Sequence, residues 1–384
     1  NGSVAVAFDF GGALPETNGT YTILTYGGTL TGSAANFVAV NAGTRFNYAF
    51  DDAVPGEIRV AVSGAPTTLT WQGGTLGNLW DIGSATNWLG SSGADAFFQG
   101  DAVLFGSSGS TAPPVNLGGA LAPASVTVSN TTAYTISGPG RLSGGAFITK
   151  LGGGSLTLET SNDYSGIMLV QEGTLLIGNS AALGLTNTGT TIANTGQLDL
   201  NGFSLGTERI TVSGPGPGGN GVLVNTGDLQ TNALRNVTLA GDTTIGGSAR
   251  WDIRGVPAEN IPASLIGNGF PLTKTGPNEV WLANLGSFTL GNITVNQGTL
   301  GFEGTNALVF NGATLTVNAG AALAFRNAFD NDFNRAILLN SCMLQNDSGH
   351  NNLTGVATLS GVVTASVGEA ATLDLRGTVN GSGG

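Results

Sequence analysis

The side chains that could act as a nucleophile or as an acid–base pair are few in this chain. His350 is the single histidine, and Asp347 and Ser348 precede it by three and two positions. Such close neighbours in one loop cannot adopt the geometry of a hydrolytic triad. Cys342 is the single cysteine, and no basic residue stands beside it to lower the pKa of its thiol. We therefore expect a polar loop at His350, a buried inert thiol at Cys342, and no catalytic residue.

One acidic segment resembles the beginning of a calcium-binding loop. Asp330, Asp332 and Asn334 alternate as the first three ligands of such a loop would. The sixth position should be glycine and the twelfth glutamate, but Arg335 and Ser341 stand there. We interpret the segment as a solvent-facing turn and predict no bound metal.

No cofactor motif stands out either. The glycine-rich run Gly214–Gly219 contains two prolines, and no lysine follows it, so it is not a phosphate-binding loop. We predict no cofactor and no enzymatic activity. One enzymatic alternative stays open, because a β-helix that acts on polysaccharides can assemble two carboxylates from adjacent coils. The 24 acidic residues would allow this, but only 12 basic residues are available to hold an acidic sugar.

Aromatic residues gather in the segment 66–115, which is rich in loops and contains Trp71, Trp80 and Trp88. Two interpretations are open. The indoles could close the hydrophobic end of a larger structure, or they could form a platform on which sugar rings stack. Exposed indoles would favour the platform, whereas buried indoles would remove its basis.

The composition indicates the elements that carry these residues. Glycine supplies 64 of 384 residues, charged residues only 9% and hydrophobic residues 40%. Short runs of alternating polarity, broken by Gly, Asn or Asp every few residues, predict strands joined by tight turns. Hydrophobic content argues against disorder, and no apolar run is long enough to span a membrane. The net charge of −12 disfavours nucleic acid and anionic membranes as partners.

The clearest pattern is an internal repeat. Residues 148–184 return, with one inserted residue, at 272–308. Lys150 and Lys274 are the only lysines of the chain, and they occupy equivalent positions in the two copies. Repeated short strands are typical of a solenoid, in which each coil buries its apolar face against its neighbours. We therefore predict an all-β chain, a parallel β-helix (β-solenoid) without significant helix.

Three regions follow from this pattern. Residues 1–65 are expected to be β-strand coils at the end of a preceding repeat unit, 66–115 a Trp-rich irregular cap or elaboration, and 116–384 the parallel β-helix with its internal repeats. Asparagine tolerates left-handed backbone and can bond its own main chain, so it suits the corners of coils. The corner candidates, whose side chains could also stack between coils, are Asn162, Asn179, Asn194 and Asn318.

The first copy of the repeat resembles the autotransporter-associated β-strand repeat, also called the passenger-associated transport repeat, of bacterial surface proteins. The matching positions are Ile148-Thr149-Lys150, Gly152, Gly154, Leu156, Leu158, Asn162, Tyr164, Gly166, Val170, Gly173-Thr174-Leu175 and Ala182-Leu183-Gly184. The second copy departs from it at Pro277 and Asn278. Large proteins with this repeat also have a W-x-G-G…N-W segment followed by G-D-x-V-x-F, matched here by Trp71-Gln72-Gly73-Gly74, Asn87-Trp88 and Gly100-Asp101-Ala102-Val103-Leu104-Phe105.

The resemblance implies a right-handed helix, export to the bacterial exterior and a structural or adhesive role, and it names no catalytic residue. We predict a structural segment of an extracellular or cell-surface fibre, stalk or filament that assembles head to tail, either with copies of itself or with tandem repeats of a longer chain. The alternative is an adhesin or glycan-binding passenger module with surface glycans as partners. Insertion into a membrane is not expected.

Overall fold

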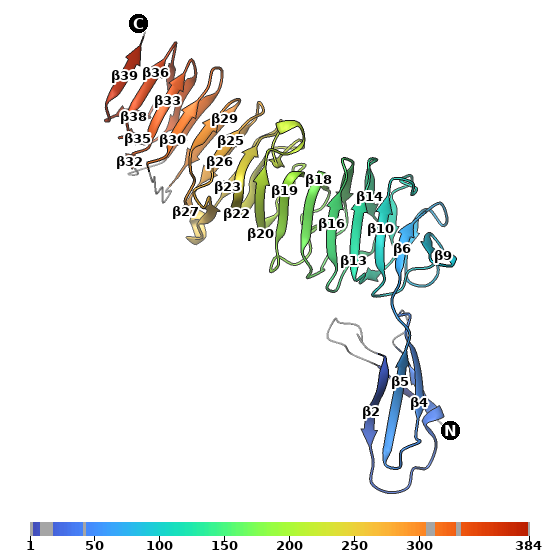
Figure 1. Cartoon of the computed structure of the whole chain (residues 1–384). Coiled ribbons are helices and arrows are strands. Elements are labelled where there is room, and N and C mark those ends of the chain that lie inside the picture. The colour runs from blue at the N-terminus through green and yellow to red at the C-terminus, as the bar shows by residue number, and fades with distance from the viewer. Residues whose placement is uncertain (1–2, 8–17, 41–43, 305–311, 328–331, 383–384) are drawn as a thin grey trace.

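The chain forms a long rod of stacked β-coils with a small separate sheet beside its N-terminal end (Figure 1). This computed structural model describes residues 3–7, 18–40, 44–304, 312–327 and 332–382. It is a β-solenoid of about 12 turns, and the helical elements of the described residues are three single 3₁₀ turns, η1 (Ala34–Asn36), η2 (Pro217–Gly219) and η3 (Pro257–Glu259). The predicted all-β parallel solenoid is confirmed; its right-handed sense stays a prediction.

Most strands of the rod belong to one sheet of 29 strands whose neighbours pair mainly in parallel. Its strands are β6 (Thr68–Trp71), β7 (Leu79–Trp80), β8 (Trp88–Gly90), β9 (Gly93–Asp95), β10 (Ala102–Gly106), β11 (Val115–Leu117), β13 (Ser125–Ser129), β14 (Tyr134–Ser137), β16 (Phe147–Leu151), β17 (Ser155–Leu158), β18 (Met168–Ile177), β19 (Thr190–Asp199), β20 (Gly206–Gly214), β21 (Leu223–Val224), β22 (Gln230–Ile245), β23 (Trp251–Arg254), β24 (Ala263–Ile266), β25 (Leu272–Lys274), β26 (Glu279–Ala283), β27 (Leu285–Phe288), β28 (Ile293–Val295), β29 (Thr299–Glu303), β30 (Thr314–Val317), β31 (Ala322–Arg326), β33 (Ala336–Asn340), β34 (Met343–Ser348), β36 (Ala357–Ser360), β37 (Thr364–Val367) and β39 (Val379–Ser382). Two smaller parallel sheets complete the coils, β12 (Ala120–Leu121) with β15 (Arg141–Leu142), and β32 (Asp332–Phe333) with β35 (His350–Leu353) and β38 (Thr372–Leu375).

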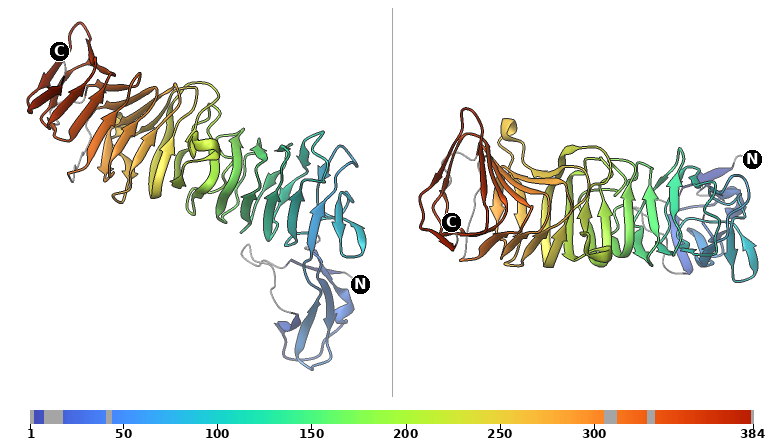
Figure 2. Two further views of the ribbon diagram at one scale, coloured as in Figure 1. Left: turned by 45° about the horizontal axis from the view of Figure 1, so that its top comes forward. Right: turned by 90° about the horizontal axis from the view of Figure 1, so that it is seen from above.

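The interior of the rod is built from columns of apolar side chains, one from each coil. Val126, Ile148 and Met168 are partners in the parallel register and are buried. Because side chains alternate along a strand, the residues between them point outward, as Thr127 and Thr149 do. Each coil therefore covers the apolar face of the next, and the strands lie side by side along the rod in both views of Figure 2.

The two copies of the repeat form equivalent coils. β16 and β17 of the first copy correspond to β25 and β26 of the second, and Lys150 and Lys274 are both buried. Asn162 of the first copy is also buried, where its Oδ1 accepts from the backbone N–H of Leu142 at 2.9 Å. The end of the second copy, 305–308, lies outside the described residues.

Asparagines do lie at the corners of the coils. Some of them are the predicted ones, and others stand at positions that were not predicted. Asn318 Nδ2 donates to Asn296 Oδ1 at 2.8 Å, and Asn340 Nδ2 donates to Asn318 Oδ1 at 3.3 Å, which confirms a stacked ladder at Asn318. Asn179 accepts from the N–H of Ala181 in a local turn. The side chain of Asn194 lies outside the described part. Left-handed backbone occurs instead at Asn78, Asn201, Asn260, Asn268, Asn284 and Asn327.

The N-terminal region does not contain the coils expected for it. β2 (Gly19–Thr25), β5 (Glu57–Ser63) and β4 (Asn47–Asp51) pair in that order as an antiparallel sheet, and β1 (Val4–Val6) pairs with β3 (Phe37–Ala39) in parallel. Only five residues join β4 to β5, a connection that suits an antiparallel hairpin and is too short for a parallel crossover. This small sheet has its own apolar cluster of Phe46, Val60 and Val62.

An ion pair attaches the small sheet to the rod. Arg45 Nε donates to Asp101 Oδ1 at 2.8 Å, and its Nη2 donates to the carbonyl oxygen of Ala96. The Asp101 side chain is fully buried and also accepts from the backbone N–H groups of Thr67 and Phe98. Asp101, part of the G-D-x-V-x-F motif, therefore fixes the junction where the first coil begins.

Candidate functional site

The tryptophans do not form a sugar-binding platform. Trp71, Trp80 and Trp88 are 0%, 0% and 1% exposed, and their rings pack against each other with centroids 4.9 Å apart for Trp71–Trp88 and 5.1 Å for Trp80–Trp88. Phe97 and Phe105 complete the cluster. β6 pairs with β10 in parallel, so the cluster fills the first coil of the rod. The indoles have no face that a sugar could reach, and the platform hypothesis is wrong.

His350 lies at the start of β35 on the surface and does not assemble a triad. Its Nε2 lies 2.9 Å from Asp374 Oδ2 on the next coil, and Arg376 Nη2 donates to the same oxygen. These hydrogen bonds, that from His350 first, lower the pKa of Asp374. Asp347 instead accepts from Arg326 Nη2 at 2.7 Å. The arrangement is a surface ion-pair cluster.

Cys342 is buried, as expected, and burial raises the pKa of its thiol. Of the calcium-like segment, Asp330 and the side chain of Asp332 lie outside the described residues, while Asn334 is exposed. Among the residues that are described, no cluster of His, Cys, Asp and Glu could hold a metal ion. No helix in that part of the chain is long and apolar enough to cross a bilayer.

Four carboxylates are buried within the described ranges, and each has a protein partner. Asp101 pairs with Arg45, and Asp252 pairs with Arg250 and Arg254. The remaining two are bound by backbone and hydroxyl donors. Asp199 accepts from the N–H groups of Asn201 and Thr226, and Glu208 accepts from Thr190. These carboxylates serve the packing of the coils.

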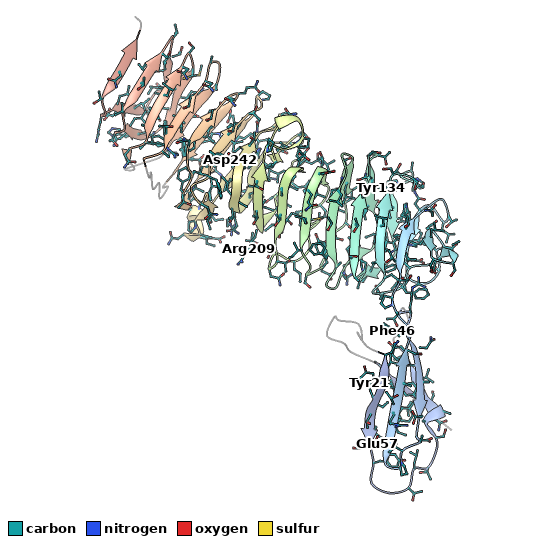
Figure 3. All side chains as sticks on the ribbon, in the orientation of Figure 1. Tyr21, Phe46, Glu57, Tyr134, Arg209 and Asp242 are labelled. Atoms are coloured by element: carbon teal, nitrogen blue, oxygen red, sulfur yellow. The ribbon has the colours of Figure 1, made fainter. Side chains whose placement is uncertain are left out.

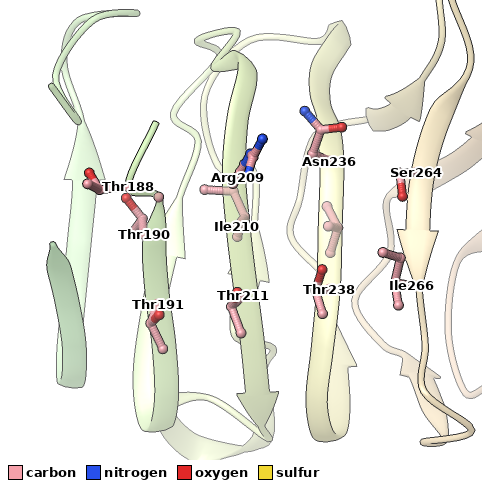
Figure 4. Close-up of a pocket in the computed structure, with 12 residues that line it drawn as sticks. Thr188, Thr190, Thr191, Arg209, Ile210, Thr211, Asn236, Thr238, Ser264 and Ile266 are labelled. Carbon is pink, nitrogen blue, oxygen red and sulfur yellow. The ribbon is translucent and has the colours of Figure 1, made fainter. Parts of the chain in front are cut away.

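A groove on the side of the rod brings together polar side chains from several coils, and some of these side chains have no partner in the described part of the chain. It has a volume of about 370 Å³ and is lined from β19, β20, β22 and β24. Figure 4 shows two rows of side chains across these neighbouring strands, with Arg209, Asn236 and Ser264 in one row and Thr191, Thr211 and Thr238 in the other. Figure 3 shows where Arg209 projects from the rod.

The threonine row follows from the parallel register. Thr191 is the partner of Thr211, and Thr211 is the partner of Thr238, so these outward positions stack along the rod. Ile266 continues the row on β24. The inward residues of the same strands, Ile210 among them, are buried and hold the strand in place.

A buried acid lies behind the groove. Thr190, which lines the groove, donates to Glu208 Oε1 at 3.0 Å, and burial raises the pKa of Glu208 to about 7. Glu208 therefore points into the rod while its neighbour Arg209 points out. Burial raises the pKa of Tyr164, and the neighbouring Glu208 raises it further.

Sequence reasoning missed this groove. The sequence does contain a pattern that indicates the threonine row. Three segments place a threonine between or beside apolar residues: Thr190-Thr191-Ile192, Ile210-Thr211-Val212 and Val237-Thr238-Leu239. Aligning the three segments requires the coil lengths, which differ: Thr211 follows Thr191 by 20 residues (211 minus 191), whereas Thr238 follows Thr211 by 27 (238 minus 211). The longer interval contains η2.

Comparison with known proteins finds one related adhesin. Over 235 residues, or 61% of this chain, the sequence is 29% identical to the adhesin BmaC autotransporter of Brucella suis biovar 1 (strain 1330). The aligned part covers 6% of that adhesin's own length. No family model matches the chain. No solved structure matches it. The chain is therefore a β-solenoid, part of which is similar in sequence to a short part of an autotransporter adhesin.

Proposed function

We propose that this chain is a structural segment of an exported bacterial surface protein, in which the solenoid serves as a rod that provides length and shape. The observation that carries the proposal is the parallel register that runs through the coils from β6 to β39. A coil of this kind cannot bury its apolar face alone, and stacking many of them yields an extended body. Similarity to an autotransporter adhesin supports a location on the cell exterior.

We further propose that the rod continues head to tail, with copies of itself or with tandem repeats of a longer chain. β37 and β39 pair with the preceding coil on one side only among the described residues. Val367 and Val379 on these strands are 48% and 46% exposed. Unpaired strand edges with exposed apolar side chains are templates for further pairing.

Electron microscopy of the purified chain tests the head-to-tail proposal. The solenoid of one molecule should measure roughly 60 Å, from about 12 turns at ~4.8 Å each. We expect longer rods as the concentration rises, and shorter ones for Val379→Lys, which places a charge on the edge. Leu185→Lys is the matched control, because Leu185 is 46% exposed but lies on a loop between coils. Single particles of constant length at every concentration would contradict stacking.

Adhesion is the second candidate function, favoured by the polar groove and by the similarity to an adhesin. Beads coated with the chain should attach to glycan-bearing cell monolayers more often than beads coated with albumin. Pre-treatment of the cells with glycosidases should reduce attachment. Equal attachment of both kinds of bead would refute the adhesive role and leave the structural role as it stands.

A further inference from the structure

The groove between β19 and β24 offers hydrogen-bonding groups that the protein itself does not use. The hydroxyls of Thr191, Thr211, Thr238 and Ser264 form no hydrogen bond within the described part of the chain. The same holds for the guanidinium of Arg209, which is exposed. We infer that this groove binds a short oligosaccharide carrying a single carboxylate, with Arg209 on the carboxylate and the threonine row on the sugar hydroxyls. The inference rests on the proposed adhesive function and assigns its ligand.

The charge of Arg209 is unusual in this molecule. Seven arginines pair with carboxylates: Arg45, Arg59, Arg141, Arg250, Arg254, Arg326 and Arg376. Arg335 is buried and donates to backbone carbonyl oxygens. Arg209 and Arg235 form no ion pair within the described residues, although acidic residues outnumber basic ones two to one. Of these two arginines, only Arg209 is exposed and lines the groove. A planar, exposed guanidinium is well suited to bidentate binding of a carboxylate from outside.

The direction of the threonine row fits an extended chain of sugars. Thr191, Thr211 and Thr238 follow each other at one coil per step, roughly 4.8 Å. Four coils line the groove, so its hydroxyls span roughly 14 Å along the rod. Ile266 at the end of the row adds an apolar side chain against which a sugar face can lie.

The overall charge selects against polyanions. With a net charge of −12, the molecule repels a densely sulfated or phosphorylated polymer. The groove is lined by one arginine, Arg209, which can neutralise one carboxylate, whereas several closely spaced anions would remain uncompensated. An oligosaccharide with a single uronic acid among neutral sugars is therefore the ligand class that fits.

Calorimetric titration of the full chain tests the inference with a tetrasaccharide that contains one uronic acid. Its carboxyl-reduced counterpart, a heparin tetrasaccharide and sodium glucuronate are the comparison ligands. We expect the monoanionic tetrasaccharide to bind best. Arg209→Gln should weaken this binding by about tenfold to a hundredfold, the usual worth of a hydrogen bond to a charged group. Thr238→Val should weaken it by a smaller factor.

Matched controls separate the groove from general effects. Arg141→Gln removes an exposed arginine elsewhere on the rod, and Thr157→Val removes an outward hydroxyl on β17. Both should bind the tetrasaccharide as the parent chain does, and all variants should keep the parent circular dichroism spectrum. Equal binding of the carboxyl-reduced sugar, or no loss on Arg209→Gln, would overturn the inference. Binding of glucuronate as tight as that of the tetrasaccharide would overturn the role of the threonine row.

The experiments can refute the adhesive function and the binding of the tetrasaccharide in the groove independently of each other. If coated beads attach to cells but the tetrasaccharide neither binds nor competes, the groove inference is refuted and adhesion stands. If the tetrasaccharide binds and Arg209→Gln abolishes binding, while beads fail to attach, the groove stands and the proposed adhesive function is refuted.

Discussion

Lys150 and Lys274, 124 residues apart in the chain, hold the same corner in two different coils. Each Nζ donates to the carbonyl oxygens of the next two residues, at 2.8 and 2.6 Å for Lys150 and at 2.7 and 2.9 Å for Lys274. A third carbonyl comes from the following coil, that of Glu172 in the first copy and that of Gln297 in the second. The lysine of the repeat is thus a structural clamp between coils.

The buried lysines predict that stability rises with pH. Burial lowers the pKa of Lys274 from 10.5 to about 7, and that of Lys150 to about 8, where Glu172 opposes the effect. Between these values and 10.5 the unfolded chain binds protons that the folded chain has lost. The free energy of unfolding therefore increases with pH in this window, by up to about 1.4 kcal/mol per pH unit for each lysine.

Urea unfolding between pH 7 and 9.5 measures this effect. Lys274→Met should remove the part of the increase in unfolding free energy with pH that Lys274 causes, because methionine fills the corner without a titrating group. Gln297→Glu is the companion variant, since it copies the first copy's Glu172 and should raise the pKa of Lys274, moving the start of the slope to higher pH. A slope that Lys274→Met leaves unchanged would assign the pH dependence to other groups.

The corner glycines beside the clamps should not tolerate a side chain. Gly173 has a φ of +70°, and a Cβ there would lie 2.3 Å from the carbonyl oxygen of Gly154 and 2.9 Å from Lys150 Nζ. We expect Gly173→Ala to lower the free energy of unfolding by about 2 kcal/mol or more. Gly153→Ala is the control, because a Cβ at Gly153 meets no atom within 4 Å; it should change stability by less than about 0.5 kcal/mol. Equal effects would show that the corner can relax.

Asp101 should govern the junction between the small sheet and the rod. Asp101→Asn removes the buried carboxylate partner of Arg45 and leaves Arg45 only the half-buried Asp95, 3.1 Å from its Nη2. Removing one partner of a buried pair costs about 3–5 kcal/mol. Limited proteolysis should then cleave near residue 64 faster than in the parent chain. Asp163→Asn, which breaks the exposed pair with Arg141, should cost no more than about 1 kcal/mol and leave the cleavage rate unchanged. Unchanged cleavage in Asp101→Asn would mean that other contacts secure the junction.

Glu208 predicts that the free energy of unfolding falls as pH rises in the acidic range, opposite to the effect of the lysines. Burial raises its pKa from 4.5 to about 7, so the folded chain keeps a proton that the unfolded chain loses between these values. The stability that this group contributes is complete below pH 4.5 and is lost as pH rises towards 7. Thermal unfolding of Glu208→Gln should lack this decline, because glutamine stays neutral. If parent and variant decline alike, Glu208 is not the titrating group.

Trp80 should matter for stability and not for sugar binding. Truncation of a buried aromatic side chain costs about 3–5 kcal/mol, so Trp80→Ala should unfold at distinctly lower urea concentration. At temperatures where the variant is still folded, its affinity for the monoanionic tetrasaccharide should equal that of the parent chain. Selective loss of sugar binding would restore the tryptophan segment as a ligand site.

The sequence by itself was sufficient to predict that the chain forms the coils of a parallel β-solenoid. Period-two alternation, frequent glycine and asparagine, and the matched pair Lys150 and Lys274 were enough to predict a parallel solenoid with equivalent corners. These features are local: the side-chain period depends on backbone geometry, and the turns depend on single residues that accept left-handed φ values. The burial of Cys342 followed from its apolar neighbours in the same way.

Only the tertiary structure decided which strands become partners. Alternation looks the same in an antiparallel hairpin and in a coil, so the sheet of β2, β5 and β4 was mistaken for coils. Whether Trp80 faces solvent or the first coil's interior depends on the pairing of β6 with β10. Arg209 lines the same groove as Thr191 and Thr238 because of the strand register, which depends on the lengths of all the loops between these strands. No short stretch of sequence contains that information.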